Sequence, residues 1–219
     1  MIENFFSQFN LKVVNYKIYD SENIFNGLAE ELYKGKTKKC ILLRKIVNKC
    51  KKKLLQENNY DDLKLLNEIR SIINGKWLEI YTCFLLFKII NECAIYFSHI
   101  NYQIYYDVEL TSIYNNKHYE LDVIAVIENY IYWIECKSGS FDESDIKKYS
   151  AIKERLEFDD NHAFCVLHLA NPKYCQKIEE KYDFRTITSE QFFTILWKCI
   201  FNDLYKIRDE LDLIIKNEN

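Results

Sequence analysis

The chain has 219 residues, 48% of them hydrophobic and 29% charged, so it is long and apolar enough to bury a core. No run of about eighteen uncharged apolar residues occurs, and the first ten residues, MIENFFSQFN, lack the layout of a signal peptide. These features exclude a disordered chain and predict a cytoplasmic protein without a membrane segment.

Several kinds of site are also excluded by residue spacing. The eight cysteines are scattered singly among apolar residues and none forms a C-x2-C pair, which argues against a zinc ribbon or an iron–sulfur cluster. The four histidines show no H-x3-H or H-E-x-x-H spacing. No nucleotide-binding glycine motif or G-x-S-x-G sequence is present.

Charge is unevenly distributed along the chain. The net charge is −3, yet residues 34–53 (KGKTKKCILLRKIVNKCKKK) contain ten lysines or arginines and no acidic residue. The rest of the chain holds 20 basic and 33 acidic side chains. A basic segment on an acidic body favours contact with a polyanion, and the alternative is a solvated helix face.

Hydrophobic spacing predicts a helix-rich beginning followed by alternating strands and helices. Strand character near 11–18 is followed by helical spacing from Ser21 to about residue 73, and by an almost wholly apolar helix at 77–97. The later elements are expected as strands at 102–114, 118–127 and 130–137, a helix at about 142–158, a strand at 163–170, a helix at 172–181, a strand at 184–188, a capped helix at 189–201 and a charged terminal helix.

Ionisable residues punctuate the two apolar strands at 118–127 and 130–137. If these strands form a hairpin closed over Glu128 and Asn129, Asp122 lies opposite Glu135, and Glu120 lies opposite Lys137. Period-two alternation then places all four side chains on one face. The alternative is an exposed face with a Glu120–Lys137 pair and two solvated acids.

Two carboxylates about 5 Å apart across a strand pair repel unless a cation lies between them. Oxygen ligands at this separation suit Mg²⁺ or Mn²⁺, with the backbone carbonyl of Cys136 as a further ligand. Lys137 would lie beside the attacking water and help its deprotonation or stabilise charge on phosphorus. The pattern predicts a site that hydrolyses phosphodiesters.

The strand with Asp122, followed by Glu135-Cys136-Lys137, resembles the signature of the PD-(D/E)XK nuclease superfamily. The resemblance implies an α/β (α+β) fold with a restriction-endonuclease-like αβββαβ core, which matches residues 77–169. It also implies a carboxylate from the first core helix, where Glu79 stands; a first-turn glutamate favoured by the helix dipole is the alternative.

The sequences G-x-W-L-E-x-Y, E-L-D-V and I-E-C-K further resemble the nuclease domain of CARF-linked ancillary nucleases of type III CRISPR systems, over about residues 70–170. The preceding segment is too short and too helical for a CARF domain, so no cyclic-oligoadenylate sensor is carried over. The expected organisation is a helical N-terminal region with a basic helix at 1–73 and a nuclease domain at 74–219.

The resemblance implies a metal-dependent endonuclease that cuts DNA in preference to RNA, works in prokaryotic or phage defence and forms a homodimer. The resemblance also allows for an unidentified activator of the nuclease. Two alternatives are a catalytically silent module that binds nucleic acid or a defence protein, and an RNA-cleaving toxin. Candidate contacts to nucleic acid are Lys148, Tyr149 and Arg155 on the helix after the motif, and Arg44, Lys45, Lys49 and Lys52 in the basic segment.

Overall fold

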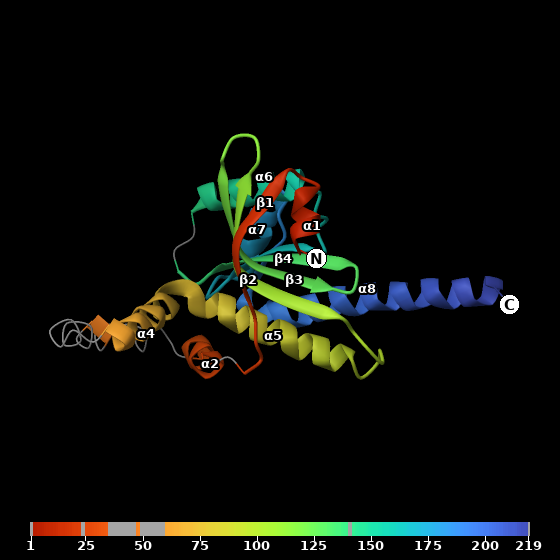
Figure 1. The fold of residues 1–219 in the computed structure, drawn as a ribbon, viewed down its shortest axis with the longest axis horizontal. Coiled ribbons are helices and arrows are strands. Elements are labelled where there is room, and N and C mark those ends of the chain that lie inside the picture. Colours follow the sequence, from red (N-terminus) through yellow and green to blue (C-terminus); the bar gives the residue numbers. More distant parts are fainter. Residues whose placement is uncertain (1, 23–24, 35–46, 49–59, 140–141, 219) are drawn as a thin grey trace.

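The computed structural model describes residues 2–22, 25–34, 47–48, 60–139 and 142–218. A six-stranded sheet with the order β1-β2-β3-β4-β5-β6 forms its centre (Figure 1). The strands are β1 (Leu11–Ile18), β2 (Tyr102–Ser112), β3 (His118–Ile127), β4 (Tyr130–Lys137), β5 (Ala163–Leu167) and β6 (Thr186–Thr188).

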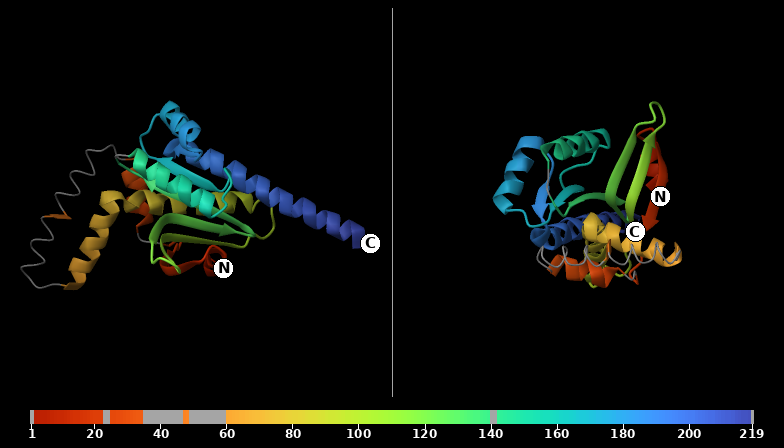
Figure 2. Two further views of the ribbon diagram at one scale, coloured as in Figure 1. Left: turned by 90° about the horizontal axis from the view of Figure 1, so that it is seen from above. Right: turned by 90° about the vertical axis from the view of Figure 1, so that its left-hand side faces the viewer.

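Helices cover both faces of the sheet, and each face buries its own apolar cluster (Figures 1 and 2). The helices α2, α5 and α8 pack on one face, while α1, α6 and α7 pack on the other. The helical elements are α1 (Ile2–Ser7), α2 (Asn26–Lys34), α4 (Tyr60–Ser71), the π-helix η1 (Ile72–Lys76), α5 (Trp77–Cys93), α6 (Glu143–Arg155), α7 (Pro172–Tyr182) and α8 (Ser189–Glu218).

The first four strands are antiparallel, while β4, β5 and β6 are parallel to one another. Parallel neighbours need a crossover, and α6 and α7 supply the two crossovers. The order from α5 to β5 is therefore αβββαβ, which confirms the predicted fold class.

The strand character expected near 11–18 is confirmed as β1, which pairs with β2 and extends the sheet, so the N-terminal region at 1–73 is helical only in part. The two helices expected at the end of the chain are one continuous helix, α8, because neither proline nor glycine interrupts the sequence after Ser189. The basic segment expected as a helix at 38–53 lies almost entirely outside the described residues.

Helix α5 explains the long apolar run at 77–97. It packs against α2, α8 and three central strands, so most of its circumference is buried. In the described part of the chain, no helix combines the length and apolarity needed to cross a bilayer.

A buried acid fastens α8 to the sheet. Asp203 is 3% exposed and accepts hydrogen bonds from the Tyr132 hydroxyl (2.7 Å) and the Lys206 ammonium (2.8 Å). Its carboxylate also bonds the His162 ring at 3.1 Å. Burial alone would raise the pKa of Asp203, but the hydrogen bonds from His162, Lys206 and Tyr132 lower it to about 2.

We expect Asp203→Ala to lower the free energy of unfolding by about 3 kcal/mol, because it leaves the buried Tyr132 hydroxyl without its acceptor and removes one of the two carboxylate partners of His162. Urea unfolding at neutral pH measures the change. Asp209→Ala, an exposed position on the same helix, is the matched control and should stay close to wild type. Equal stability of the two variants would contradict this role for Asp203.

Candidate active site

The backbone pairing of β3 with β4 ends one residue before the two acids. Val123 pairs with Ile134 and Ile127 with Tyr130, which is the register predicted from a hairpin closed over Glu128 and Asn129. Beyond this point β3 continues along β2, while β4 continues along β5. Asp122 and Glu135 therefore lie where two strands of one sheet separate.

The side chains of the two acids accept hydrogen bonds from backbone amides at the point where the strands separate. The Asp122 amide donates to Glu135 Oε1 (3.2 Å), and the Cys136 amide donates to Asp122 Oδ2 (2.7 Å). The Trp133 indole also donates to Glu135 Oε1 at 2.8 Å. Both carboxyl groups are thus fixed in position by neighbouring N–H groups.

Crowding makes it difficult for both acids to be ionised. Burial raises the pKa of Glu135, which is 2% exposed, well above its ordinary value, and the Asp122 carboxylate raises it further. Burial also raises the pKa of Asp122, although the Cys136 amide and Lys137 oppose the rise.

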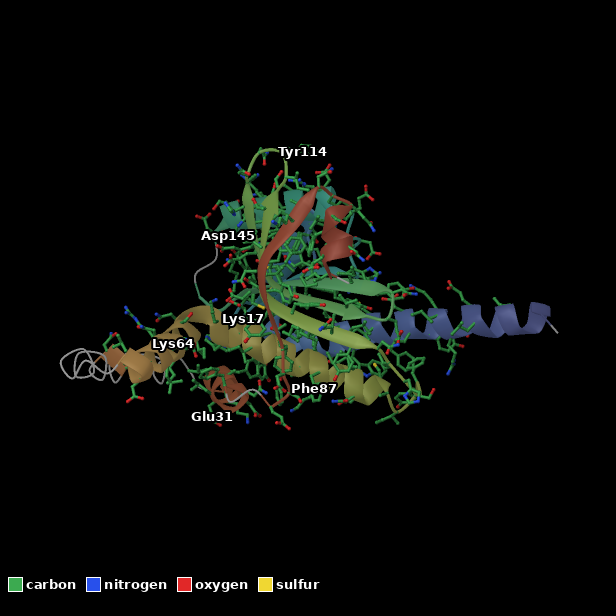
Figure 3. All side chains as sticks on the ribbon, in the orientation of Figure 1. Lys17, Glu31, Lys64, Phe87, Tyr114 and Asp145 are labelled. Atoms are coloured by element: carbon green, nitrogen blue, oxygen red, sulfur yellow. The ribbon has the colours of Figure 1, made fainter. Side chains whose placement is uncertain are left out.

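Lys137 ends β4 and lies at the edge of the acid pair. Its ammonium is 3.7 Å from Asp145 Oδ2 on α6 and 5.4 Å from the centre of the Tyr149 ring (Figure 3 labels Asp145). Helix α6 is held at this place by its N-cap, since Asp142 accepts from the Ser144 amide. The lysine therefore has a weak internal partner and keeps 28% side-chain exposure.

Glu79 reaches the same cluster from the first turn of α5. Burial raises its pKa to about 8, the Asp122 carboxylate adds to the rise, and Lys76 opposes it. The structure therefore brings Asp122, Glu135 and Lys137 together on two strands, with Glu79 of α5 within electrostatic range of Asp122.

A fourth acid, Asp107, was not predicted from the sequence. It has a left-handed backbone (φ 57°) and interrupts the pairing of β2 with β3 between Tyr106–Val123 and Val108–Leu121, opposite Asp122. Lys76 and Lys17 bind its carboxylate at 2.6 and 2.9 Å, and together they hold its pKa below the ordinary value despite burial. The only signal in the sequence is an aspartate in the middle of a strand, where the residue is disfavoured.

Glu120 does not lie opposite Lys137. It pairs with Glu109 of β2 and is exposed, whereas Lys137 pairs with Leu167 of β5. The prediction was wrong here because it extended the hairpin symmetry past the point where β3 and β4 separate.

The structure places the residues proposed to contact nucleic acid in different environments. Tyr149 is 3% exposed and packs against Trp133, so it is a core residue and cannot reach phosphate. Arg155 donates to the Tyr119 hydroxyl and to the carbonyl of Phe9 (3.3 Å), so it fastens α6 to the N-terminal segment. Lys148 is exposed on α6. Four further candidates, Arg44, Lys45, Lys49 and Lys52, lie outside the described residues.

The donor set fits a hard divalent cation that keeps most of its water. In the described part of the chain, no three His, Cys, Asp or Glu side chains are close enough to form a metal site by themselves. Mg²⁺ commonly takes only one or two carboxylates. Asp122 and Glu135, each held by a backbone amide of the other strand, supply two such ligands.

Comparison with known proteins agrees with this arrangement. Residues 66–167 match the family model of the Card1-like endonuclease domain. This Card1-like segment runs from α4 to β5 and contains Glu79, Asp122, Glu135 and Lys137, and the match confirms the predicted resemblance to nucleases of this kind. A search of curated protein sequences finds no significant match.

Two solved structures share the fold. Protein VC1899 from Vibrio cholerae is 16% identical, with a TM-score of 0.54 over 91% of this chain and 62% of its own. Can2 from Sulfobacillus thermosulfidooxidans, solved in complex with cyclic tetra-adenylate, is 16% identical, with a TM-score of 0.55 over 91% of this chain and 61% of its own. The chain thus spans about three-fifths of the length of either neighbour.

In the presence of a chelator, we expect the free energy of unfolding to fall by about 2 kcal/mol as pH rises from 4.5 to 8. Over this range folded Glu79, with its pKa raised from 4.5 to about 8, holds a proton that the unfolded chain has released. The stabilisation is complete below 4.5 and is lost as pH rises through 8. Urea unfolding at several pH values measures it, and the decline should be shallower in Glu79→Gln; an equal slope in both proteins would contradict it.

Proposed function

We propose that this chain is a divalent-metal-dependent nuclease that hydrolyses phosphodiester bonds. The observation that carries the proposal is the pair of Asp122 and Glu135 carboxyl groups, each of which accepts a hydrogen bond from a backbone amide of the other strand, beside Lys137. The Card1-like match supports the same reaction class.

Asp122, Glu135 and the Cys136 carbonyl would hold Mg²⁺ or Mn²⁺, and Glu79 would assist. When bound, the cation would supply Lewis acidity toward the phosphodiester. The amides of Asp122 and Cys136 orient the two carboxylates, so binding needs little rearrangement of the protein. Lys137 would stabilise the negative charge that develops on the phosphate oxygens.

We further propose DNA in preference to RNA as substrate, and a role in defence against foreign nucleic acid. The substrate preference rests on family resemblance. The defence role is supported by the Card1-like match and by the fold shared with Can2, whose structure contains cyclic tetra-adenylate. Duplex cutting needs two sites, so we propose a homodimer as the form that acts on duplex DNA.

A catalytically silent module that binds nucleic acid is the second candidate. One observation favours it: among the described residues, no group of three metal-binding side chains is preassembled. Conversion of Glu135 into a group that cannot ionise distinguishes the candidates, because a binding module does not need this buried charge.

We expect wild-type protein to cut plasmid or single-stranded DNA with Mn²⁺ or Mg²⁺ and not with EDTA, and Glu135→Gln and Lys137→Ala to cut at least about 100-fold more slowly. Gel assays with DNA and RNA substrates, each with and without cyclic tetra-adenylate, measure this. Glu120→Gln is the matched control, because Glu120 lies on the same strand as Asp122 but pairs with Glu109.

Cleavage that persists in EDTA or in Glu135→Gln would contradict the proposed site. Nucleic-acid binding without cleavage under every condition would favour the silent module. Cleavage of RNA alone would favour the toxin-like alternative.

A further inference from the structure

A cavity of about 600 Å³ lies next to the acid cluster and has no part in holding the proposed metal. It is bordered by α4, η1, the start of α5, the end of β1, the middle of β2, and Phe25. Lys17 at the end of β1 and Lys64 on α4 both line it (Figure 3). Its size lies within the range of pockets that enclose small ligands.

The cavity is joined to the active site through shared residues. Lys17 and Lys76 line the cavity, and the same two ammonium groups bind the Asp107 carboxylate. Asp107 lies opposite Asp122 in the β2–β3 pairing, and Lys76 also acts on the pKa of Glu79. A chain of phosphates that passed over the acid pair would therefore meet these two lysines next.

The walls of the cavity combine the chemistry that a nucleotide requires. The Tyr106 and Phe25 rings provide aromatic surface, and Asn67 provides an amide. Lys17, Lys64 and Lys76 provide cations for phosphate. Three ammonium groups around one cavity disfavour a purely apolar ligand.

We propose that this cavity receives one unstacked nucleotide of the substrate strand, next to the phosphodiester that is cut. The inference rests on the proposed function, because it is that reaction which brings a strand to the acid pair. Every base can stack on an aromatic ring, so the cavity would not select a particular sequence. It would instead favour unpaired strands, whose bases are free to enter. A base within a duplex could enter only after unpairing.

The first test measures binding in EDTA, where the proposed cleavage does not occur. A short fluorescein-labelled DNA strand and its duplex are titrated with full-length protein, and anisotropy gives Kd. We expect Tyr106→Leu to bind the single strand at least about fivefold more weakly, Tyr106→Phe to bind it as wild type does, and both variants to bind the duplex unchanged.

A lysine pair tests the phosphate contact without altering an aromatic wall. Lys64 is exposed on α4, and Lys177 is equally exposed on α7, outside the cavity. Lys64→Ala should reduce the salt dependence of single-strand binding by about 0.7 in the log–log slope, and Lys177→Ala should leave it unchanged. Equal effects of the two variants would overturn the assignment.

Photo-crosslinking locates the base directly and does not depend on variants. A strand that carries 5-bromouracil is irradiated with wild-type protein in EDTA, and we expect the crosslinked peptides to contain Tyr106 or Phe25. Crosslinks confined to other peptides, or single-strand binding unaffected in Tyr106→Leu, would overturn the proposal while wild-type cleavage left the nuclease function intact. Crosslinks at the cavity without cleavage under any condition would instead contradict the nuclease function, and absence of single-strand binding by a protein that cleaves would overturn the cavity assignment alone.

Discussion

The structure depends on a pair of carboxyl groups at the point where β3 and β4 separate. Beyond Val123 and Ile134 the strands turn toward different neighbours, and the pairing of β3 with β2 is also interrupted at Asp107. The Cys136 amide donates to Asp122 and the Asp122 amide donates to Glu135, so the side chains satisfy N–H groups that these two interruptions expose. The acids are therefore part of the sheet as well as of the site.

This double role explains why buried like charges are tolerated in an apolar sheet. An unpaired buried carboxylate is costly, and the backbone amides and the Trp133 indole that donate to the two acids reduce that cost in the absence of a cation. A cation could bind at the acid pair without changing the backbone. The alanine variant of either acid would lose a backbone acceptor as well as a charge, which makes amide variants the informative ones.

The local parts of this architecture were predictable from sequence, and the long-range parts were not. The alternating pattern and the two-residue turn fix the β3–β4 register, and the apolar run at 77–97 fixes α5, because both depend on neighbours in sequence. The point where β3 leaves β4 depends on β2 and β5 instead, so the assumed Glu120–Lys137 pair fails. From the sequence, Tyr149 could be either a core residue on the apolar face of α6 or a phosphate contact. Its packing against Trp133, which depends on the tertiary structure, shows that it is a core residue.

Asp107 is a further active-site residue whose role depends on elements distant in the sequence. Its left-handed backbone breaks the β2–β3 pairing opposite Asp122, and this break faces the place where β3 leaves β4. At Asp122, β3 has separated from β4 and its pairing with β2 is interrupted, so the backbone ladders on both sides omit this residue. Lys17 and Lys76, which come from β1 and the end of η1, neutralise the acid that this break introduces. Two lysines from elements far apart in the sequence thus compensate the charge of Asp107. This compensation allows the sheet pairing to be interrupted opposite Asp122.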